Sequence, residues 1–338
     1  MRTTRTTRRR TLTATAVVLA SALALSACGS DDSGADSGPG ADSGSGSTDD
    51  AGGSDGTRTV QTVMGDVEVP GNPQRVVVLD TAELDSAITL GVRPVGTVHA
   101  DVEGGFLDYL PQDQVADIEN VGTIGNPNLE QILALEPDLI IGSVVRDEER
   151  YDDLTGIAPT VFTEQPGGPW KENFLLHAEA LNKVTEAESV IAEYQEHAAE
   201  ITEALGGPDT AAQTEVSILR FIEGGDTRLY GRQNYIGTIL EDLGLGRPAI
   251  VEDAEDGFAV EVSPEQVDLA DGDVIFYTSY GSAEKSGEEK ALNGPLWESM
   301  TAVQNDQVFH VEDQLWFLGI GYTAANLILD EIETALVG

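Results

Sequence analysis

The sequence predicts an α/β fold of two similar lobes with parallel sheets, joined by one long helix. The first observation is an internal repeat: residues 128–141 read N-L-E-Q-I-L-A-L-E-P-D-L-I-I, and residues 263–276 read S-P-E-Q-V-D-L-A-D-G-D-V-I-F. In each copy an Asp follows the Glu by eight residues and opens an apolar run, which indicates two lobes built on one plan. Two similar lobes imply a cleft between them, where small ligands usually bind.

The second observation is an alternation of apolar, β-branched runs with segments of helical periodicity, which is typical of parallel α/β packing. We expect strands at 75–80, 93–98, 138–141 and 160–163 in the first half, and at 215–221, 273–277 and 307–311 in the second. We expect helices at 82–90, 128–135, 235–243 and 323–336, and a further helix starting at 263–266.

The third observation is the stretch 170–205, where apolar residues recur with a period near 3.6 until Gly206-Gly207-Pro208 ends it. It predicts one long helix, or two in close succession. The folded part therefore divides into a first lobe at 58–169, an interlobe helix at 170–205 and a second lobe at 206–338.

The N-terminus has the features of an export signal at residues 1–27: several arginines, a short apolar middle and small residues before Cys28. The run Leu25-Ser26-Ala27-Cys28 resembles a bacterial lipobox, which implies cleavage before Cys28 and lipidation of its sulfur. The other interpretation is a buried structural cysteine. The arginines leave both the general and the twin-arginine export routes open. Cys28 is the chain's one cysteine, so it has no partner for an intrachain disulfide.

Residues 28–57 predict a disordered acidic tether. Residues 29–57 contain 9 Gly, 7 Ser and 7 Asp, with no aromatic residue and no Leu, Ile or Val. Such a segment cannot bury enough surface to offset its ordering entropy. We therefore expect an extracytoplasmic protein that a lipid anchors to the cell membrane through this disordered tether.

Composition excludes nucleic acid as a partner. Without the five N-terminal arginines the chain has 13 basic against 60 acidic residues, a net charge of −47. Nucleic-acid binding and adhesion of the folded part to anionic lipid both need a basic surface. Basic residues near the cleft are correspondingly informative.

Four segments in order, 73–97, 121–141, 230–248 and 295–311, resemble the iron-siderophore substrate-binding proteins of ABC transporters, and the similarity extends over 60–338. The resemblance implies the two-lobed class III periplasmic-binding-protein architecture. It also implies a monomer that captures a ferric siderophore and passes it to a membrane permease with its ATPase, without catalysis or a cofactor. Cobalamin and haem are the alternative cargoes, because the same superfamily binds them.

The resemblance further implies that one glutamate on each lobe docks onto permease arginines. The matching positions are Glu130 and Glu265, the glutamates of the repeat. A carboxylate on an exposed helix start can pair with Arg in bidentate geometry. The competing interpretation is that both acids only favour their helix dipoles.

Candidate ligand-binding residues follow predicted strand ends, where ligands of open α/β lobes bind. Arg220 matches a cleft arginine of the family, expected to donate to metal-bound oxygens, and Trp316 matches a cleft aromatic. The weaker candidates are Tyr230, Arg232, Tyr280, His99, Tyr109 and Arg146. The alternative for each is a surface or core position, and Trp170 is expected to serve in packing.

The scarcity of basic residues favours a neutral or cationic ferric hydroxamate over an anionic tris-catecholate. A site for bare metal ions is not expected, because such sites need several His with carboxylates and only four His exist. An enzyme is not expected either, because no G-x-S-x-G, H-E-x-x-H or P-loop motif occurs.

Overall fold

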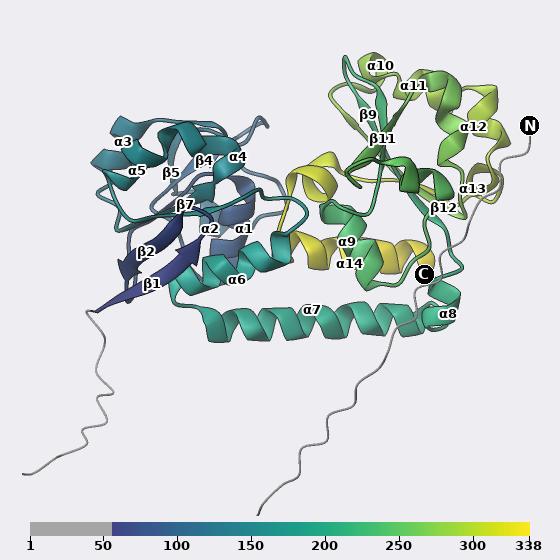
Figure 1. Cartoon of the computed structure of the whole chain (residues 1–338). Coiled ribbons are helices and arrows are strands. Elements are labelled where there is room, and N and C mark those ends of the chain that lie inside the picture. Colours follow the sequence, from purple (N-terminus) through teal and green to yellow (C-terminus); the bar gives the residue numbers. More distant parts are fainter. Residues whose placement is uncertain (1–55) are drawn as a thin grey trace, which may run out of the picture. The chain divides into compact units, whose positions relative to one another are not determined.

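The computed structural model describes residues 56–338 (Figure 1). The predicted signal at 1–27, the lipidation site Cys28 and all but the last two residues of the predicted tether lie outside the described residues. Within 56–338, no helix combines the length and the apolar character needed to cross a bilayer.

The first lobe is built on a six-stranded sheet of order β6-β5-β4-β3-β7-β8. Its central strand β3 (Val76–Val78) is buried on both faces, as its run of β-branched residues predicts. The strands are parallel except for β6. The other members are β4 (Gly96–His99), β5 (Glu119–Thr123), β6 (Asn126–Pro127), β7 (Leu139–Ser143) and β8 (Thr160–Thr163).

Helices connect these strands, and side-chain caps fix where two of them begin. Asp80 accepts a hydrogen bond from the Thr81 amide at 2.7 Å, and Asn128 accepts two in the repeat helix. The helices are α1 (Thr81–Thr89), α2 (Gln112–Val115), α3 (Leu129–Ala134), α4 (Val144–Asp147) and α5 (Tyr151–Thr155), with a 3₁₀ turn at Glu148–Arg150.

The Asp of each repeat copy ties its strand to the neighbouring one. The Asp138 carboxylate accepts from the amides of Gln74 and Arg75 at 2.7 and 2.8 Å. In the second lobe the Asp273 carboxylate accepts from the Glu215 amide at 2.8 Å. The repeated Asp therefore has a structural role: it hydrogen-bonds the chain where the adjacent parallel strand begins.

The second lobe has a five-stranded sheet of order β11-β10-β9-β12-β13. β9, β12 and β13 are parallel, whereas β10 and β11 pair antiparallel, so this sheet is mixed rather than parallel as predicted. The strands are β9 (Val216–Ile222), β10 (Thr227–Tyr230), β11 (Ala259–Val262), β12 (Val274–Tyr280) and β13 (Val308–His310).

The helices of the second lobe are mostly short. The two longest, α9 (Tyr235–Asp242) and α14 (Tyr322–Leu336), agree with the sequence prediction. The others are α8 (Pro208–Ala211), α10 (Ala283–Ser286), α11 (Glu288–Leu292), α12 (Pro295–Ser299) and α13 (Thr301–Gln304), with 3₁₀ helices at Ala249–Asp253 and Pro264–Ala270 and a π-type turn at Gln314–Leu318.

The predicted helix at 170–205 is two helices, α6 (Trp170–Leu181) and α7 (Val184–Ala204). Asn182 ends α6 in the left-handed conformation with φ of 58°, one of the few non-glycine residues that adopt it readily. Trp170 is buried against the rings of Tyr194, Tyr235 and Tyr322. The expectation that Trp170 serves in packing is confirmed.

An antiparallel hairpin of β1 (Thr57–Thr62) and β2 (Gly65–Pro70) precedes the first sheet and was not predicted. The Arg58 guanidinium donates to the backbone carbonyl oxygens of Pro70 and Ala180, which attaches the hairpin to the end of α6. This hairpin is the first element of the described residues.

Candidate ligand-binding site

A cavity of about 500 Å³ is lined by both lobes, within the size range of small-molecule sites. Most of its wall comes from the carboxyl ends of the parallel strands, as expected for this fold class. The first lobe contributes Asp80, Thr81, His99, Ala100, Asp101, Thr123, Ile124 and Arg146, and the second contributes Tyr280, Phe317, Leu318 and Ile320.

On the first-lobe wall, Arg146 and His99 lie where the sequence predicted them. The Arg146 Nε donates to the Asp80 carboxylate at 2.8 Å. Among the described residues no hydrogen-bond partner is found for its terminal nitrogens, so they can donate to a ligand. The His99 ring contacts Phe106, and partial burial lowers its pKa, which favours the neutral imidazole.

Below this wall lies a group of buried polar side chains. Glu83 on α1 has both carboxylate oxygens buried without a hydrogen-bond partner, and burial together with the nearby Asp80 raises its pKa to about 8. Ser143 Oγ and one oxygen of Asp147 are also buried and unpartnered. Burial raises the pKa of Asp147 as well. This side of the cavity therefore rests on a buried glutamic acid, Glu83, that is largely neutral near pH 7.

Directly behind the second-lobe wall, the Arg220 guanidinium contacts two aromatic rings. Its centre is 4.8 Å from the ring centroid of Tyr280 and 4.9 Å from that of Phe317. Two of its nitrogens donate to the two oxygens of Asp313 at 2.6 Å each. Burial lowers the pKa of Arg220, but the hydrogen bonds and charge of Asp313 together with the nearby Tyr230 raise it overall. Arg220 thus stays charged and holds both rings at the cavity.

The prediction for Trp316 needs correction, because its side chain has no exposed surface. Its indole Nε1 donates to Glu331 at 2.6 Å, and its ring stacks on Phe276 in the core. The aromatic residue on the cavity wall is the next one along, Phe317. Tyr230 is also buried and lies behind the wall, with its ring 4.8 Å from Phe317.

Two further candidates lie away from the cavity wall. The Tyr109 hydroxyl donates to the buried Asp85 at 2.9 Å, and burial raises the pKa of Tyr109 well above its usual value. Arg232 pairs with Glu252 at 2.8 Å. The structure thus brings Arg146, His99 and Tyr280 to the wall and Arg220 directly behind it, but neither Tyr109 nor Arg232.

Sequence reasoning missed the acids that neutralise these arginines. Asp80 ends the first predicted strand run, and Asp313 follows the last one. Both residues lie at or just after the end of a predicted strand, and this same signal identified Arg146. They were overlooked because acidic residues are so common in this chain that their presence at a strand end was uninformative.

The two repeat glutamates are exposed and lie at helix starts on different lobes. The Glu130 amide is held by the cap from Asn128 at 3.1 Å, and Glu265 is in the first turn of the 3₁₀ helix Pro264–Ala270. Neither carboxylate forms an ion pair with another described residue, so both are available to a partner.

A bare-metal site is not found at the cavity within the part of the chain that the structure describes. Only one group of three metal-ligating side chains has its atoms close together in residues 56–338, and it lies on α7 and α14. A second hollow of about 380 Å³ is lined by second-lobe residues alone, between β13 and α14. The cavity between the lobes is therefore the candidate site for a larger ligand.

Comparison with known proteins places the chain in a family. The model of the periplasmic binding protein family matches residues 76–315, most of the described chain. A probable siderophore-binding lipoprotein of Bacillus subtilis, YfiY, is 36% identical over 328 residues, covering 94% of this chain and 95% of the relative. The achromobactin-binding periplasmic protein of Dickeya dadantii is 30% identical over 269 residues, covering 77% and 85%.

Solved structures agree with these relatives. Staphylococcus aureus SirA complexed with staphyloferrin B matches with a TM-score of 0.74 and 32% identity, over 83% of this chain and 98% of SirA. The triscatecholate siderophore binding protein FeuA of B. subtilis, complexed with ferri-bacillibactin, matches with a TM-score of 0.69 and 25% identity, over 82% and 98%. The class III fold predicted from the sequence is confirmed.

These relatives are binding proteins rather than enzymes, and two of them are named as a lipoprotein and a periplasmic protein. The predicted absence of catalysis is supported by that kinship, and the siderophore is a ligand rather than a cofactor. The chain belongs to the periplasmic binding protein family, and within it to the iron-siderophore substrate-binding proteins that work with ABC transporters.

Proposed function

We propose that this protein captures a ferric siderophore of the hydroxamate type in the cavity between its lobes and delivers it to an ABC-transporter permease. The observation that carries the proposal is a cavity of about 500 Å³ walled by Arg146 from one lobe and Tyr280 and Phe317 from the other. Because a ligand in this cavity contacts both lobes, its binding can change the relative position of the lobes.

The charges around the cavity favour a neutral chelate. Arg146 is paired with Asp80 and Arg220 with Asp313, so neither arginine leaves an uncompensated positive charge. Asp101 adds a further acid to the wall. A tris-catecholate with three negative charges would meet net repulsion here, whereas a neutral or cationic ferric hydroxamate would not.

The relatives support siderophore binding but differ in cargo. SirA was solved with staphyloferrin B and FeuA with ferri-bacillibactin. Since one fold accepts different siderophores, the cavity residues must set the preference. In this chain the exposed Tyr280 ring and Phe317 offer apolar contact, and the terminal nitrogens of Arg146 offer hydrogen bonds to iron-bound oxygens. Direct donation by Arg220 stays a prediction.

Delivery and anchoring complete the proposal. Glu130 and Glu265 dock the two lobes onto arginines of the permease, which the transporter ATPase drives. Diacylglyceryl modification at Cys28 anchors the protein to the cell membrane, since two acyl chains hold a protein far more firmly than one. The tether lets a monomeric binding domain reach both its ligand and its transporter.

Fluorescence titration of the purified protein tests the proposal, because Trp170, Trp297 and Trp316 give an intrinsic signal. Ferrioxamine and ferrichrome should bind more tightly than a ferric tris-catecholate, haem or cobalamin. Tighter binding of the catecholate would overturn the hydroxamate assignment, and saturation by haem or cobalamin alone would overturn the siderophore.

Variants locate the site. Tyr280→Ala should weaken the hydroxamate complex at least about tenfold, equivalent to about 1.4 kcal/mol, because an aromatic wall is lost. Leu175→Ala removes a similarly exposed apolar side chain from α6, away from the cavity, and should leave affinity unchanged. Equal effects of the two substitutions would argue against this cavity as the binding site.

A further inference from the structure

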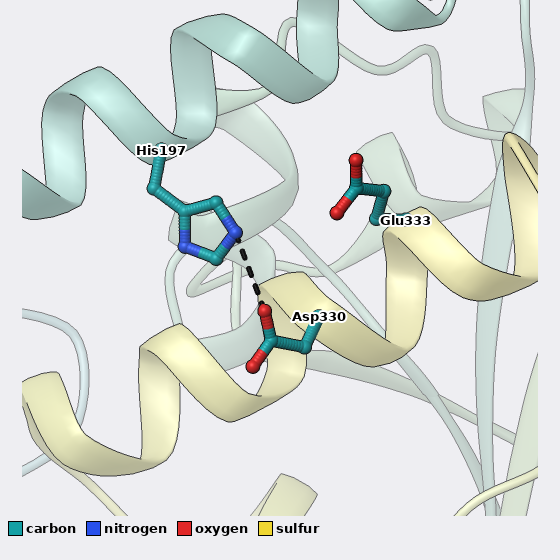
Figure 2. Close-up of side chains that lie close together, drawn as sticks. All are labelled: His197, Asp330 and Glu333. Carbon is teal, nitrogen blue, oxygen red and sulfur yellow. Dashed lines mark ion pairs between the residues drawn. The ribbon is translucent and has the colours of Figure 1, made fainter.

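Three metal-ligating side chains meet between α7 and α14, outside the ligand cavity. His197 on α7 faces Asp330 and Glu333 on α14 (Figure 2). One ligand atom from each residue lies within 4.8 Å of the other two. The His197 Nε2 and an oxygen of Asp330 are 3.4 Å apart. One nitrogen and two carboxylates thus converge from two helices that are distant in sequence.

Hydrogen bonds around His197 determine which ring nitrogen carries a proton. The side-chain amide nitrogen of Asn326 donates to the Tyr322 carbonyl at 2.9 Å, which turns its oxygen the other way. That oxygen lies 3.1 Å from the His197 Nδ1 and can only accept, so Nδ1 is the donor. In the neutral imidazole the Nε2 lone pair then points toward the carboxylate of Asp330.

This arrangement places two hydrogen-bond acceptors face to face. A lone pair on Nε2 and a carboxylate oxygen repel unless a proton or a metal ion lies between them. Metal-binding histidines typically donate their other N–H to an oxygen, which fixes the tautomer and the ring orientation. Asn326 holds His197 in this way without being a ligand itself.

We propose that His197, Asp330 and Glu333 form a site for a divalent transition-metal ion, for which Zn²⁺ is the best match. Imidazole with carboxylates suits Zn²⁺, and three protein ligands leave one tetrahedral position for water. Mg²⁺ and Ca²⁺ prefer oxygen ligands alone, so His197 gives the site its selectivity. The exposed Glu193, Glu196 and Glu200 on α7 raise the local concentration of cations.

The bound ion would join α7 to the C-terminal helix. The N-terminus of α14 is already attached to the first lobe, because Asp85 on α1 accepts hydrogen bonds from the amides of Thr323 and Ala324 at 3.2 Å each. A metal bridge further along α14 would fix α7 as well. None of the three ligands lines the siderophore cavity, so the site is independent of the proposed cargo.

Calorimetric titration of the chelator-treated protein with ZnCl₂ at pH 7.5 tests the site, with MgCl₂ in a parallel titration. The wild type should bind one equivalent of Zn²⁺ and bind Mg²⁺ at least about tenfold more weakly. Zinc should raise the midpoint of thermal unfolding, since it binds the folded state.

Variants assign the ligands. His197→Ala should abolish saturable zinc binding, Glu333→Gln should weaken it at least about tenfold, and Asn326→Leu should weaken it about tenfold through loss of orientation. Glu188→Gln makes the same charge change on α7 about 13 Å away along the helix and should have no effect.

Two results would overturn the proposal. Equal affinity for Zn²⁺ and Mg²⁺ in the wild type would show that the acidic surface attracts cations without a site. Unchanged zinc affinity in His197→Ala would place the zinc elsewhere, and this reading holds if circular dichroism shows that the variant is folded. Affinity for the ferric siderophore should be the same in every variant, so failure of this site leaves the proposed function untouched.

Discussion

The two copies of the repeat fold differently although they place Glu, Gln and Asp at the same positions. In the first lobe, Asn128 accepts from the amides of Glu130 and Gln131, and α3 is a regular α-helix. In the second, the segment Pro264–Ala270 is a 3₁₀ helix with a break at Gln266. The Ser263 hydroxyl there bonds the side chain of Gln266 rather than a backbone amide.

This difference shows which part of the pattern is structural. The Asp of both copies hydrogen-bonds the start of the neighbouring strand, through Asp138 and Asp273. Both glutamates remain exposed at a helix start. The type of helix between the Glu and the Asp differs with its N-terminal cap. The two copies therefore share the positions of Glu and Asp but not the type of helix.

The two walls of the cavity differ as well. The first-lobe wall rests on Asp80, Glu83 and Asp147, several of whose oxygens are buried without partners. Behind the second-lobe wall, Arg220 is fully paired with Asp313 and contacts two aromatic rings. The first-lobe wall is therefore sensitive to protonation of Glu83, whereas Arg220 behind the second-lobe wall stays charged at ordinary pH.

The largest expected effect on stability comes from removing the ion pair between Arg220 and Asp313. Arg220→Leu leaves Asp313 poorly solvated and unpaired and should lower the free energy of unfolding by about 3–5 kcal/mol. Arg146→Leu should cost less, about 1–2 kcal/mol, because the buried Asp80 keeps its hydrogen bonds from the amide and hydroxyl of Thr81. Urea denaturation measures the free energy of unfolding of each variant. The double variant Arg220→Leu/Asp313→Leu should recover part of the loss, and equal costs at the two arginines would contradict the contrast between the walls.

The stability of the first-lobe wall should depend on pH through Glu83. Its folded-state pKa of about 8 lies above the ordinary value of 4.5, so its contribution to stability is complete below about pH 4.5 and is lost as pH rises toward 8. Relative to wild type, Glu83→Gln should gain about 3–4 kcal/mol between pH 5 and pH 8.5. Denaturation curves at both values measure the gain; no change would mean that Glu83 is ionised in the fold.

The exposed glutamates should affect transport without affecting binding. Glu130→Ala combined with Glu265→Ala should reduce uptake of the ferric siderophore at least about tenfold in cells, equivalent to about 1.4 kcal/mol of docking energy. Siderophore affinity of the purified variant should be unchanged. The control Glu188→Ala should transport normally, and normal uptake by the double variant would leave both acids with a helix-dipole role only.

The smallest expected effect separates the two caps. Asn128→Ala removes an acceptor for two amides and should cost about 1 kcal/mol. Ser263→Ala removes no backbone cap and should cost no more than about 0.3 kcal/mol. Unfolding midpoints of the two variants show the difference directly, and a larger loss at Ser263 would mean that its hydroxyl does stabilise the 3₁₀ helix.

Much of the fold was predictable because burial periodicity is local. The strand at Thr160–Thr163 and the helices α1, α9 and α14 agree with prediction to within a few residues. The hairpin of β1 and β2 was missed because its strands are mostly exposed and carry little apolar signal. The antiparallel pairing of β10 and β11 escaped for a different reason: β10 is mostly buried, but the pairing partner and direction of a strand are not encoded locally.

The site was harder to predict because irregular turns decide which of its side chains point toward the cavity. The π-type turn at Gln314–Leu318 directs Trp316 into the core and Phe317 toward the cavity, and no periodic pattern reveals that choice. Arg146 and Tyr280 were predictable, because each follows a parallel strand. Tyr109 and Arg232 follow strand-like segments too, but long-range partners Asp85 and Glu252 hold them elsewhere.

The most direct test of the central claim is a crystal structure of the protein grown with a ferric hydroxamate such as ferrioxamine. The account predicts the iron chelate between Arg146 on one side and Tyr280 and Phe317 on the other, in contact with both lobes. A chelate bound to one lobe alone, or in the hollow between β13 and α14, would contradict it.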